Sequence, residues 1–395
     1  MKKNALAILL GIVFLSSCVI YVPYEGEQGQ PEPRAPREDR YDRSYDEYPD
    51  ETDTGYFYEY LAPYGVWVSY SPYGYVWIPR RIGPRWRPYT YGRWAWTNYG
   101  WTWVSYDAWG WAPFHYGRWG WDRRLGWFWV PGNVWAPAWV TWRWGNLYIG
   151  WAPLPPDVEF VAGVGVRSLP YDFPHNHWVF IEGRHFQHDY LDRYVLPYER
   201  SATLVNFTVH KSNLAQRNRQ IFNEGVDVEQ VRRVIGNEVS RYQLEEARRP
   251  GESRVSGDAV SIYRPVVRKN ETARPKTALQ KEEAEERAPE IRREQMERQY
   301  SGSDMERRLR NDQDEEMQRV EETQKREEAE LRRRAEDEKR LASGNADKEK
   351  AQKDYEVKAN ELKKQHQEEK TKIAERHQEE EKTVKGGRIK KKEQN

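Results

Sequence analysis

Indoles recur two positions apart through residues 56–155, with small or polar residues between them. Trp94-Ala95-Trp96 and Trp101-Thr102-Trp103 each place two indoles on one face of an extended chain, because side chains of a strand alternate between faces. Short polar pieces such as Thr97-Asn98-Tyr99 separate these runs, as hairpin loops do. The pattern predicts β-hairpins with one tryptophan-rich face and an opposite face that is wet or closely approached.

The predicted hairpin is repeated along the chain. Tyr91-Gly92-Arg93-Trp94-Ala95-Trp96 returns as Tyr116-Gly117-Arg118-Trp119-Gly120-Trp121, and Gly100-Trp101-Thr102-Trp103 returns as Gly126-Trp127-Phe128-Trp129. Internal repeats of this length indicate one supersecondary unit used several times. We therefore predict a mainly β fold, in which an antiparallel hairpin meander over 56–156 closes as a barrel or a sandwich.

The tryptophan face has two possible uses. Large apolar rings normally form a core, because so much apolar surface is rarely left in water. Alternatively, some rings form open platforms that stack on sugars, with arginines beside them for anionic groups. The candidate platform residues are Trp94, Trp96, Trp101, Trp103, Trp119, Trp121, Trp127, Trp129, Arg93 and Arg118.

Residues 157–268 predict a small α+β region after the repeats. Alternating apolar residues favour strands at 178–181 and 202–209. Asp227 is placed to cap a short helix over 228–235, and Gly236 is placed to end it.

Residues 269–395 form a charged tail rich in good helix formers. Leu331, Leu341, Leu362 and Ile373 are too sparse for a sustained heptad seam. The pattern favours a long solvated single helix, or a weak, partner-dependent coil, over a sustained coiled coil, with a break at 343–345. Such a tail can reach toward a partner protein or a glycan.

The N-terminal segment predicts export and lipid anchoring. Lys2 and Lys3 precede a short apolar run, and Leu15-Ser16-Ser17-Cys18 resembles the lipobox of bacterial lipoproteins. In that class the cysteine carries fatty acyl chains, and two or three chains anchor a protein stably. Cys18 is the one cysteine of the chain, so no disulfide is available. Val19 follows it, which by analogy with enteric bacteria favours the outer membrane, facing the periplasm.

Residues 19–55 predict a disordered tether between the signal peptide, 1–18, and the repeats. The segment combines several prolines with an excess of acidic residues, so it cannot bury enough apolar surface to fold. Its length predicts a mobile spacer of roughly 35 Å that holds the next domain clear of the lipid headgroups.

Charge and motifs exclude several functions. The net charge is +1, so the chain has no bulk electrostatic preference for nucleic acid. No hydrolase elbow, zincin or phosphate-loop signature occurs, and we expect neither an enzyme nor a cofactor. One weaker possibility is a metal site built from closely spaced histidines, namely His175, His177, His185 and His188.

Several motifs in 61–155 resemble a known class. Leu61-Ala62-Pro63-Tyr64-Gly65-Val66-Trp67, Gly110-Trp111-Ala112-Pro113 and Gly150-Trp151-Ala152-Pro153 are similar to the YxWGxW or WxxGxW motifs of tryptophan-rich repeat lipoproteins. The resemblance implies a secreted or lipid-anchored protein of unassigned function, without established catalytic residues. The sequence thus favours a structural or interaction role in the envelope, and the alternative is a module that binds peptidoglycan or polysaccharide.

Overall fold

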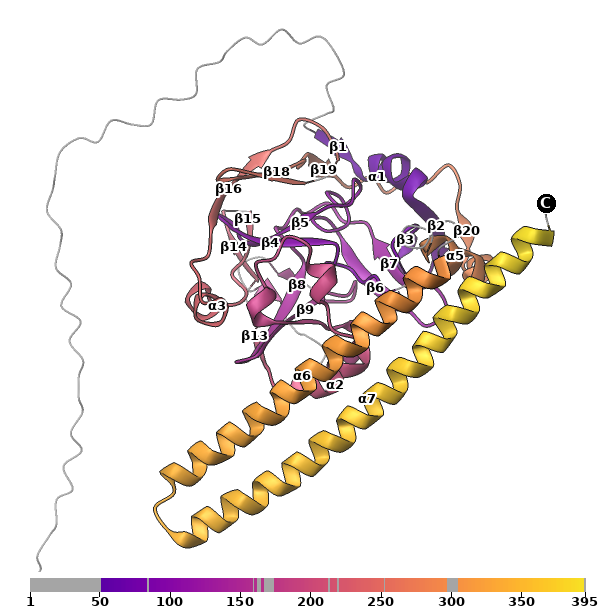
Figure 1. Ribbon diagram of the computed structural model, residues 1–395. Coiled ribbons are helices and arrows are strands. Elements are labelled where there is room, and N and C mark those ends of the chain that lie inside the picture. The colour runs from indigo at the N-terminus through magenta and orange to yellow at the C-terminus, as the bar shows by residue number, and fades with distance from the viewer. Residues whose placement is uncertain are drawn as a thin grey trace, which may run out of the picture. The chain divides into compact units, whose positions relative to one another are not determined.

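The computed structural model describes residues 51–83, 85–158, 160–161, 165–166, 174–211, 214–218, 220–251, 253–296 and 305–393 (Figure 1). The predicted signal peptide, Cys18 and the tether up to residue 50 lie outside this part of the chain. The tether was expected to continue to residue 55. Instead, strand β1 (Glu51–Asp53) and helix α1 (Thr54–Leu61) already occupy its last residues.

Four tryptophan hairpins confirm the predicted repeat. They are β2 (Gly65–Tyr70) with β3 (Gly74–Pro79), β4 (Gly92–Thr97) with β5 (Gly100–Ser105), β6 (Arg118–Asp122) with β7 (Gly126–Val130), and β8 (Val140–Trp144) with β9 (Tyr148–Pro153). Each hairpin sets one equivalent pair of indoles directly opposite each other, and the second and third hairpins each add a further pair. The equivalent cross-strand pairs are Trp67 with Trp77, Trp94 with Trp103, Trp119 with Trp129, and Trp142 with Trp151.

The hairpins are divided among three sheets. β3 pairs with β7, so the first and third hairpins share a sheet, to which β20 (Leu279–Gln280) adds an edge. The second hairpin lies inside a seven-stranded sheet, and the fourth lies between two later strands. The added strands are β12 (Val179–Glu182), β13 (Val209–Lys211), β14 (Leu214–Arg217), β15 (Gln220–Asn223), β16 (Arg241–Glu246), β17 (Arg254–Ser256) and β18 (Ala259–Ile262).

The α+β region expected after residue 156 therefore folds into the same body as the repeats. Its strands complete the sheets of the hairpins, and β19 (Val266–Arg268) pairs in parallel with β1. Phe160–Val161 and Gly165–Val166 form a separate two-stranded pair, β10 and β11. We call residues 51–280 the body.

Indoles from all four hairpins meet in one core. The rings of Trp94 and Trp142 are 4.6 Å apart between centroids, although they come from different sheets. Buried indoles also donate hydrogen bonds to main-chain carbonyls, for example Trp129 to Tyr116 at 2.7 Å and Trp151 to Tyr89 at 2.9 Å. These bonds fix ring orientation, so the core is directional as well as apolar.

The opposite face of the hairpins is closely approached, as expected. Gly120 lies under the ring of Phe128, and Gly150 lies under the ring of Phe180. A β-carbon at either position would collide with the aromatic ring, which explains glycine there. A larger side chain at either position would have to displace this ring.

Short helices connect the strands of the body. α3 (Val228–Ile235) is as predicted: the Asp227 carboxylate accepts from the Gln230 amide at 3.0 Å, and Gly236 ends the helix at φ 73°. The strand predicted over 202–209 is wrong, because 201–206 form helix α2 (Ser201–Asn206). Ser201 and Leu204 point inward at helical spacing, and so short a segment fits both periods.

The charged tail forms short helices α4 (Lys281–Glu286) and α5 (Ala288–Met296), then a long helical hairpin, α6 (Met305–Leu341) with α7 (Asn345–Glu393). The break predicted at 343–345 is confirmed. Of the two favoured forms of the tail, the solvated single helix is wrong, because the two long helices contact each other. α6 and α7 run antiparallel and contact each other, as the bonds Gln313–Glu380 (3.0 Å) and His366–Glu327 (2.7 Å) show. No helix in the described residues is both long and apolar enough to span a membrane.

The core predicts a sharp contrast between two tryptophans of one hairpin. Trp129 is fully buried, whereas Trp121 is 40% exposed. Trp129→Ala should lower the free energy of unfolding by about 3–5 kcal/mol, because it leaves a cavity and an unsatisfied carbonyl. Trp121→Ala should cost much less. Urea unfolding followed by tryptophan fluorescence measures both, and equal losses would contradict this account of the core.

Candidate functional site

The helical hairpin has a buried seam with an unusual composition. Buried residues on α6 recur in alternating steps of four and three: Leu309, Gln313, Glu316, Val320, Thr323 and Glu327. The matching positions on α7 are Leu362, His366, Glu369, Ile373 and Glu380. Most of these side chains are polar, so the seam cannot be stable unless each polar group finds a partner.

Arg200 of the body supplies the central partner. It lies at the end of the short 3-10 helix Tyr198–Arg200 and is fully buried. Its guanidinium donates to both oxygens of Glu327, at 2.6 and 2.7 Å, and to Glu369 at 3.1 Å. The Tyr148 hydroxyl donates to the same Glu327 carboxylate at 2.6 Å. One body arginine therefore neutralises carboxylates from both helices.

These contacts keep both partners charged. Burial alone would lower the pKa of Arg200, but the charges of Glu327 and Glu369 raise it above its ordinary value. Burial alone would raise the pKa of Glu327. The Arg200 charge and the His366 and Tyr148 hydrogen bonds outweigh burial and lower it. The pair is thus a true buried ion pair.

A second ionic cluster surrounds Arg376 of α7. Arg376 binds Glu199 of the body at 2.6 Å and Glu316 of α6 at 2.9 Å. Arg85 of the body also reaches Glu316, at 3.1 Å. Burial by itself would raise the pKa of Glu316, but the His377 hydrogen bond and both arginines lower it to about 2. The cluster therefore holds body, α6 and α7 together.

The docking contacts cover only part of the hairpin. On α6 they involve Glu316 to Glu327, and on α7 Glu369 and Arg376. A third pair, Arg326 with Glu182 at the end of β12, lies in the same part of α6. We call residues 331–361, which include the turn between the helices, the distal arm. Its side chains are mostly exposed, including Leu341 and Val357.

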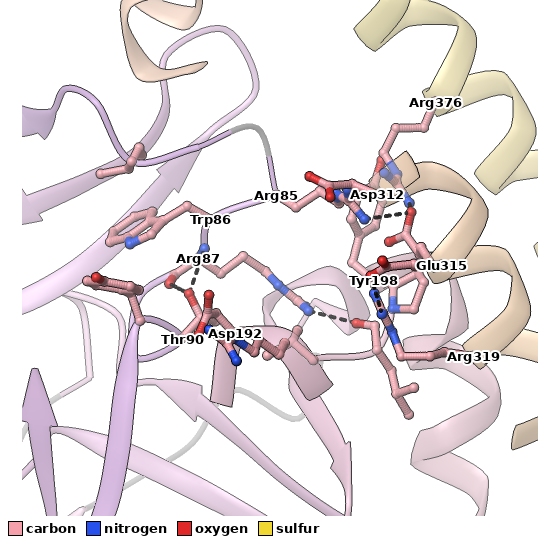
Figure 2. A pocket seen from close by; sticks show the side chains of 17 residues that line it. Arg85, Trp86, Arg87, Thr90, Asp192, Tyr198, Asp312, Glu315, Arg319 and Arg376 are labelled. Atoms are coloured by element: carbon pink, nitrogen blue, oxygen red, sulfur yellow. Dashed lines mark hydrogen bonds and ion pairs between the residues drawn. The ribbon is translucent and has the colours of Figure 1, made fainter. Parts of the chain in front are cut away.

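A cavity of about 610 Å³ lies beside these clusters, between body and hairpin (Figure 2). Trp86, Tyr91 and Tyr198 line it, together with five arginines and four carboxylates: Arg85, Arg87, Arg193, Arg319, Arg376, Asp192, Asp312, Glu315 and Glu316. Arg87 donates to the carbonyls of Trp178 (2.5 Å) and Leu196 (3.0 Å), and burial lowers its pKa to about 10. Arg87 therefore remains a cation at neutral pH.

A second cavity, of about 540 Å³, lies where the ends of β3 and β5 meet α5. Three aromatic rings line it, from Tyr64, Tyr106 and Trp109. Its charged lining consists of three arginines and two carboxylates: Arg80, Arg81, Arg293, Asp107 and Glu294. Both cavities thus combine aromatic rings with a small excess of arginine.

The predicted platform tryptophans do not form an open surface. Six of the eight are buried, namely Trp94, Trp101, Trp103, Trp119, Trp127 and Trp129. Trp96 is half-buried against Trp101, and Trp121 alone of the eight is exposed. The platform expectation fails at the six buried positions, because the sheets of the body close over the tryptophan faces.

The two candidate platform arginines are occupied within the protein. Arg93 pairs with Asp189 and lies near the ring of Tyr242. Arg118 stacks over Trp139, 3.5 Å from the ring centroid, and burial lowers its pKa to about 10. Both arginines therefore strengthen the body rather than present charge to a ligand.

The histidine candidates divide into two places. His177 packs against Trp127, and burial lowers its pKa to about 4. His185 and His188 lie together against Tyr194, and burial likewise lowers the pKa of His185 to about 4. His175 is exposed. Across the described residues, no group of three or more His, Cys, Asp or Glu side chains is arranged to hold a metal.

Comparison with known proteins matches the segment that contains the tryptophan hairpins, but it assigns no function to that segment. Residues 58–158 match the model of DUF6600, a family of unknown function. That segment contains all four tryptophan hairpins. No curated protein and no solved structure matches the chain significantly.

Sequence reasoning missed Arg200 and its partners. The signal was present in the steps of four and three that link Leu309, Gln313, Glu316, Val320, Thr323 and Glu327. The polar members of the seam interrupt the apolar heptad pattern, so the apolar positions alone do not reveal it. Nothing local marks Arg200 as the partner, since it lies more than a hundred residues away.

Removing the central guanidinium should release the hairpin. Arg200→Met leaves Glu327 and Glu369 buried without a cation, which should cost about 3–5 kcal/mol of stability. Adding Glu327→Leu should restore part of the loss. Arg333→Met is the matched control, because Arg333 pairs with carboxylates on the exposed part of α6. Urea unfolding followed by circular dichroism measures the stability of all three variants. A small effect of Arg200→Met would contradict the conclusion that Arg200 holds the hairpin on the body.

Acid should undock the hairpin through Glu316. The folded pKa of Glu316 is about 2, below its ordinary value of 4.5. Its contribution to stability is therefore complete above pH 4.5 and is lost as pH falls toward 2. The helical melting temperature should drop across this window. Glu316→Gln should lower the plateau and flatten the drop; an identical pH profile in that variant would contradict the assignment.

Proposed function

We propose that this chain is a lipid-anchored, non-catalytic interaction protein of the bacterial cell envelope. In this proposal the body is a rigid base, and the docked helical hairpin presents its distal arm to another envelope protein. The proposal rests chiefly on one observation. The hairpin is fixed to the body along part of its length, while residues 331–361 remain exposed.

The body suits the role of a rigid base. Several indoles of its core, such as Trp129 and Trp151, donate hydrogen bonds to main-chain carbonyls, which fixes the orientation of those rings. The ion clusters of Arg200 and Arg376 then define where the hairpin sits. A rigid mount reduces the conformational entropy that a partner would otherwise have to remove on binding.

The distal arm has features of a contact surface. Leu341 and Val357 are 79% and 66% exposed, on either side of the turn between the helices. Charged residues of both signs surround them, which favours a specific protein partner over a membrane surface of one sign. The contact would be short and charge-guided.

The envelope location rests on the sequence. The lipobox-like Leu15-Ser16-Ser17-Cys18 supports an acylated cysteine, and the acidic tether supports a spacer above the lipid. The likeness to tryptophan-rich repeat lipoproteins points the same way. Because Val19 follows the cysteine, we place the anchor in the outer membrane, with the protein facing the periplasm.

Site-specific crosslinking in living cells tests both parts. A photoreactive amino acid at Val357 should yield a discrete crosslinked partner, and one at the exposed Arg249 of the body should not. Labelled fatty acid should enter the wild type but not Cys18→Ser, whose Val357 adduct should fall at least several-fold. Absence of a Val357 adduct would refute the arm. An unlabelled wild type would refute the anchor.

A further inference from the structure

The cavities carry chemistry that the proposed interaction role does not use. We infer that the two cavities form one extended binding site for a linear glycan that bears carboxylates on some of its sugars. The cavity beside the hairpin is called the hairpin cavity, and the one beside α5 is called the α5 cavity. The inference goes beyond the proposed function and rests on it only for the envelope source of the glycan.

The two cavities are neighbours on one chain segment. Residues 80 and 81 line the α5 cavity, and residues 82 and 85–87 line the hairpin cavity. An aromatic ring of one cavity also contacts an aromatic ring of the other. Tyr91 of the hairpin cavity meets Tyr106 of the α5 cavity edge to face, with ring centroids 5.7 Å apart. The ring contact places the two cavities side by side, and the inference assigns one linear ligand to both.

Aromatic rings give both cavities surfaces for sugar rings. Trp86, Tyr91 and Tyr198 line the hairpin cavity, and Tyr64, Tyr106 and Trp109 line the α5 cavity. Each cavity lies within the ~300–1,000 Å³ range of small-ligand sites. Flat apolar rings among hydrogen-bonding side chains match the faces and hydroxyls of a sugar. The aromatic role expected of the hairpin tryptophans thus falls to other rings.

In both cavities, arginines without a carboxylate partner among the described residues favour a ligand that carries an anionic group. Arg81 and Arg293 of the α5 cavity make no ion pair with any residue in the described part of the chain. In the hairpin cavity, the Arg87 guanidinium donates to two main-chain carbonyls and to no carboxylate of the described residues, and Arg193 lies over the ring of Tyr190. Guanidinium groups bind carboxylates with two parallel hydrogen bonds. Each cavity can therefore accept a carboxylate.

The balance of charge selects the class of ligand. Each cavity has one more arginine than it has carboxylates. A polyphosphate chain carries a negative charge on every unit, so Asp192, Asp312 and Glu315 would repel it. A glycan with only some acidic sugars fits better, because its hydroxyl groups can donate to these same carboxylates. The walls thus favour a sparsely charged polyhydroxyl chain over nucleic acid.

The backbone at Arg81 supports a binding role. Its φ is 53°, a left-handed conformation that is uncommon outside glycine. The conformation is held because the Arg81 amide donates to the Glu294 carbonyl at 3.2 Å, and the Gly83 amide donates to the Gln295 carbonyl at 2.7 Å. Strain of this kind is often kept where it positions a functional side chain. Here it holds Arg81 at the edge of the α5 cavity.

Calorimetric titration of the full-length protein in detergent tests the inference. The probe is peptide-free glycan strands from peptidoglycan, which carry a carboxylate on every second sugar. The matched probe is the same strands after reduction of their carboxylates to alcohols. The native strands should bind at least ten-fold more tightly than the reduced strands. Equal affinity for both, or no binding at millimolar concentration, would overturn the inference.

Variants assign the binding to the cavities. Arg81→Gln with Arg293→Gln should weaken binding at least ten-fold, and Arg193→Gln should weaken it several-fold. Arg233→Gln with Arg249→Gln is the control, because both arginines are exposed on the body away from the cavities. Circular dichroism should show that all variants remain folded. Affinities that do not respond to the cavity variants would place binding elsewhere and refute the site.

Two further measurements separate this inference from its rivals. Double-stranded DNA or phosphatidylglycerol vesicles should bind far more weakly than the native strands. Comparable binding that the same variants weaken would indicate a general polyanion site and would overturn the glycan assignment. Deletion of residues 331–361 should leave glycan affinity unchanged, so the distal arm and the cavities can fail independently.

Discussion

The guanidinium of Arg200 decides where the helical hairpin can lie. Glu327 and Glu369 are buried, and a buried carboxylate without a cation costs several kcal/mol. In the observed position of the hairpin, both carboxylates reach the Arg200 guanidinium. The energetic gain of such a pair over an apolar contact is small, but its geometric selectivity is high, because any displaced arrangement leaves charges uncompensated. The position of the hairpin is therefore set by the free-energy cost of leaving buried carboxylates without a cation.

The body meets a complementary requirement. Four similar hairpins place indole pairs at equivalent positions, and the pairs converge from three sheets on one core. Large rings fill such a centre with few residues, and several of their N–H groups donate to main-chain carbonyls. A single-cysteine chain thus obtains a firm base without disulfides. Charge then positions the hairpin on this base, while aromatic packing keeps the base from deforming.

Local patterns in the sequence were reliable where local physics decides the structure. The W-x-W spacing predicted the hairpins, Asp227 and Gly236 predicted α3, and 343–345 predicted the turn between α6 and α7. Alternation was ambiguous over 201–206, which is too short to separate a strand from a helix. The hairpins, α3 and the turn are each determined by interactions among residues close in sequence, and the same local pattern is too short to decide the structure of 201–206.

Long-range partners escaped the sequence. A two-residue period shows that indoles share a face, but it does not show what covers that face, so buried tryptophans were candidates for open platforms. A heptad pattern identifies two helices whose apolar side chains pack against each other. It does not identify a pair of helices whose buried polar groups are bound by a third element, as Glu327 is bound by Arg200. The cavities depend on segments that meet only in the folded chain. Composition alone gave no means of finding Arg81 or Arg193.

The segregation of tryptophan has a practical optical consequence. All 19 indoles lie between Trp67 and Trp178, and the helical hairpin contains none. Tryptophan emission therefore reports on the body alone, whereas the amide signal at 222 nm is dominated by the two long helices. Loss of one signal before the other would resolve the order in which the two parts come apart, within a single unlabelled sample.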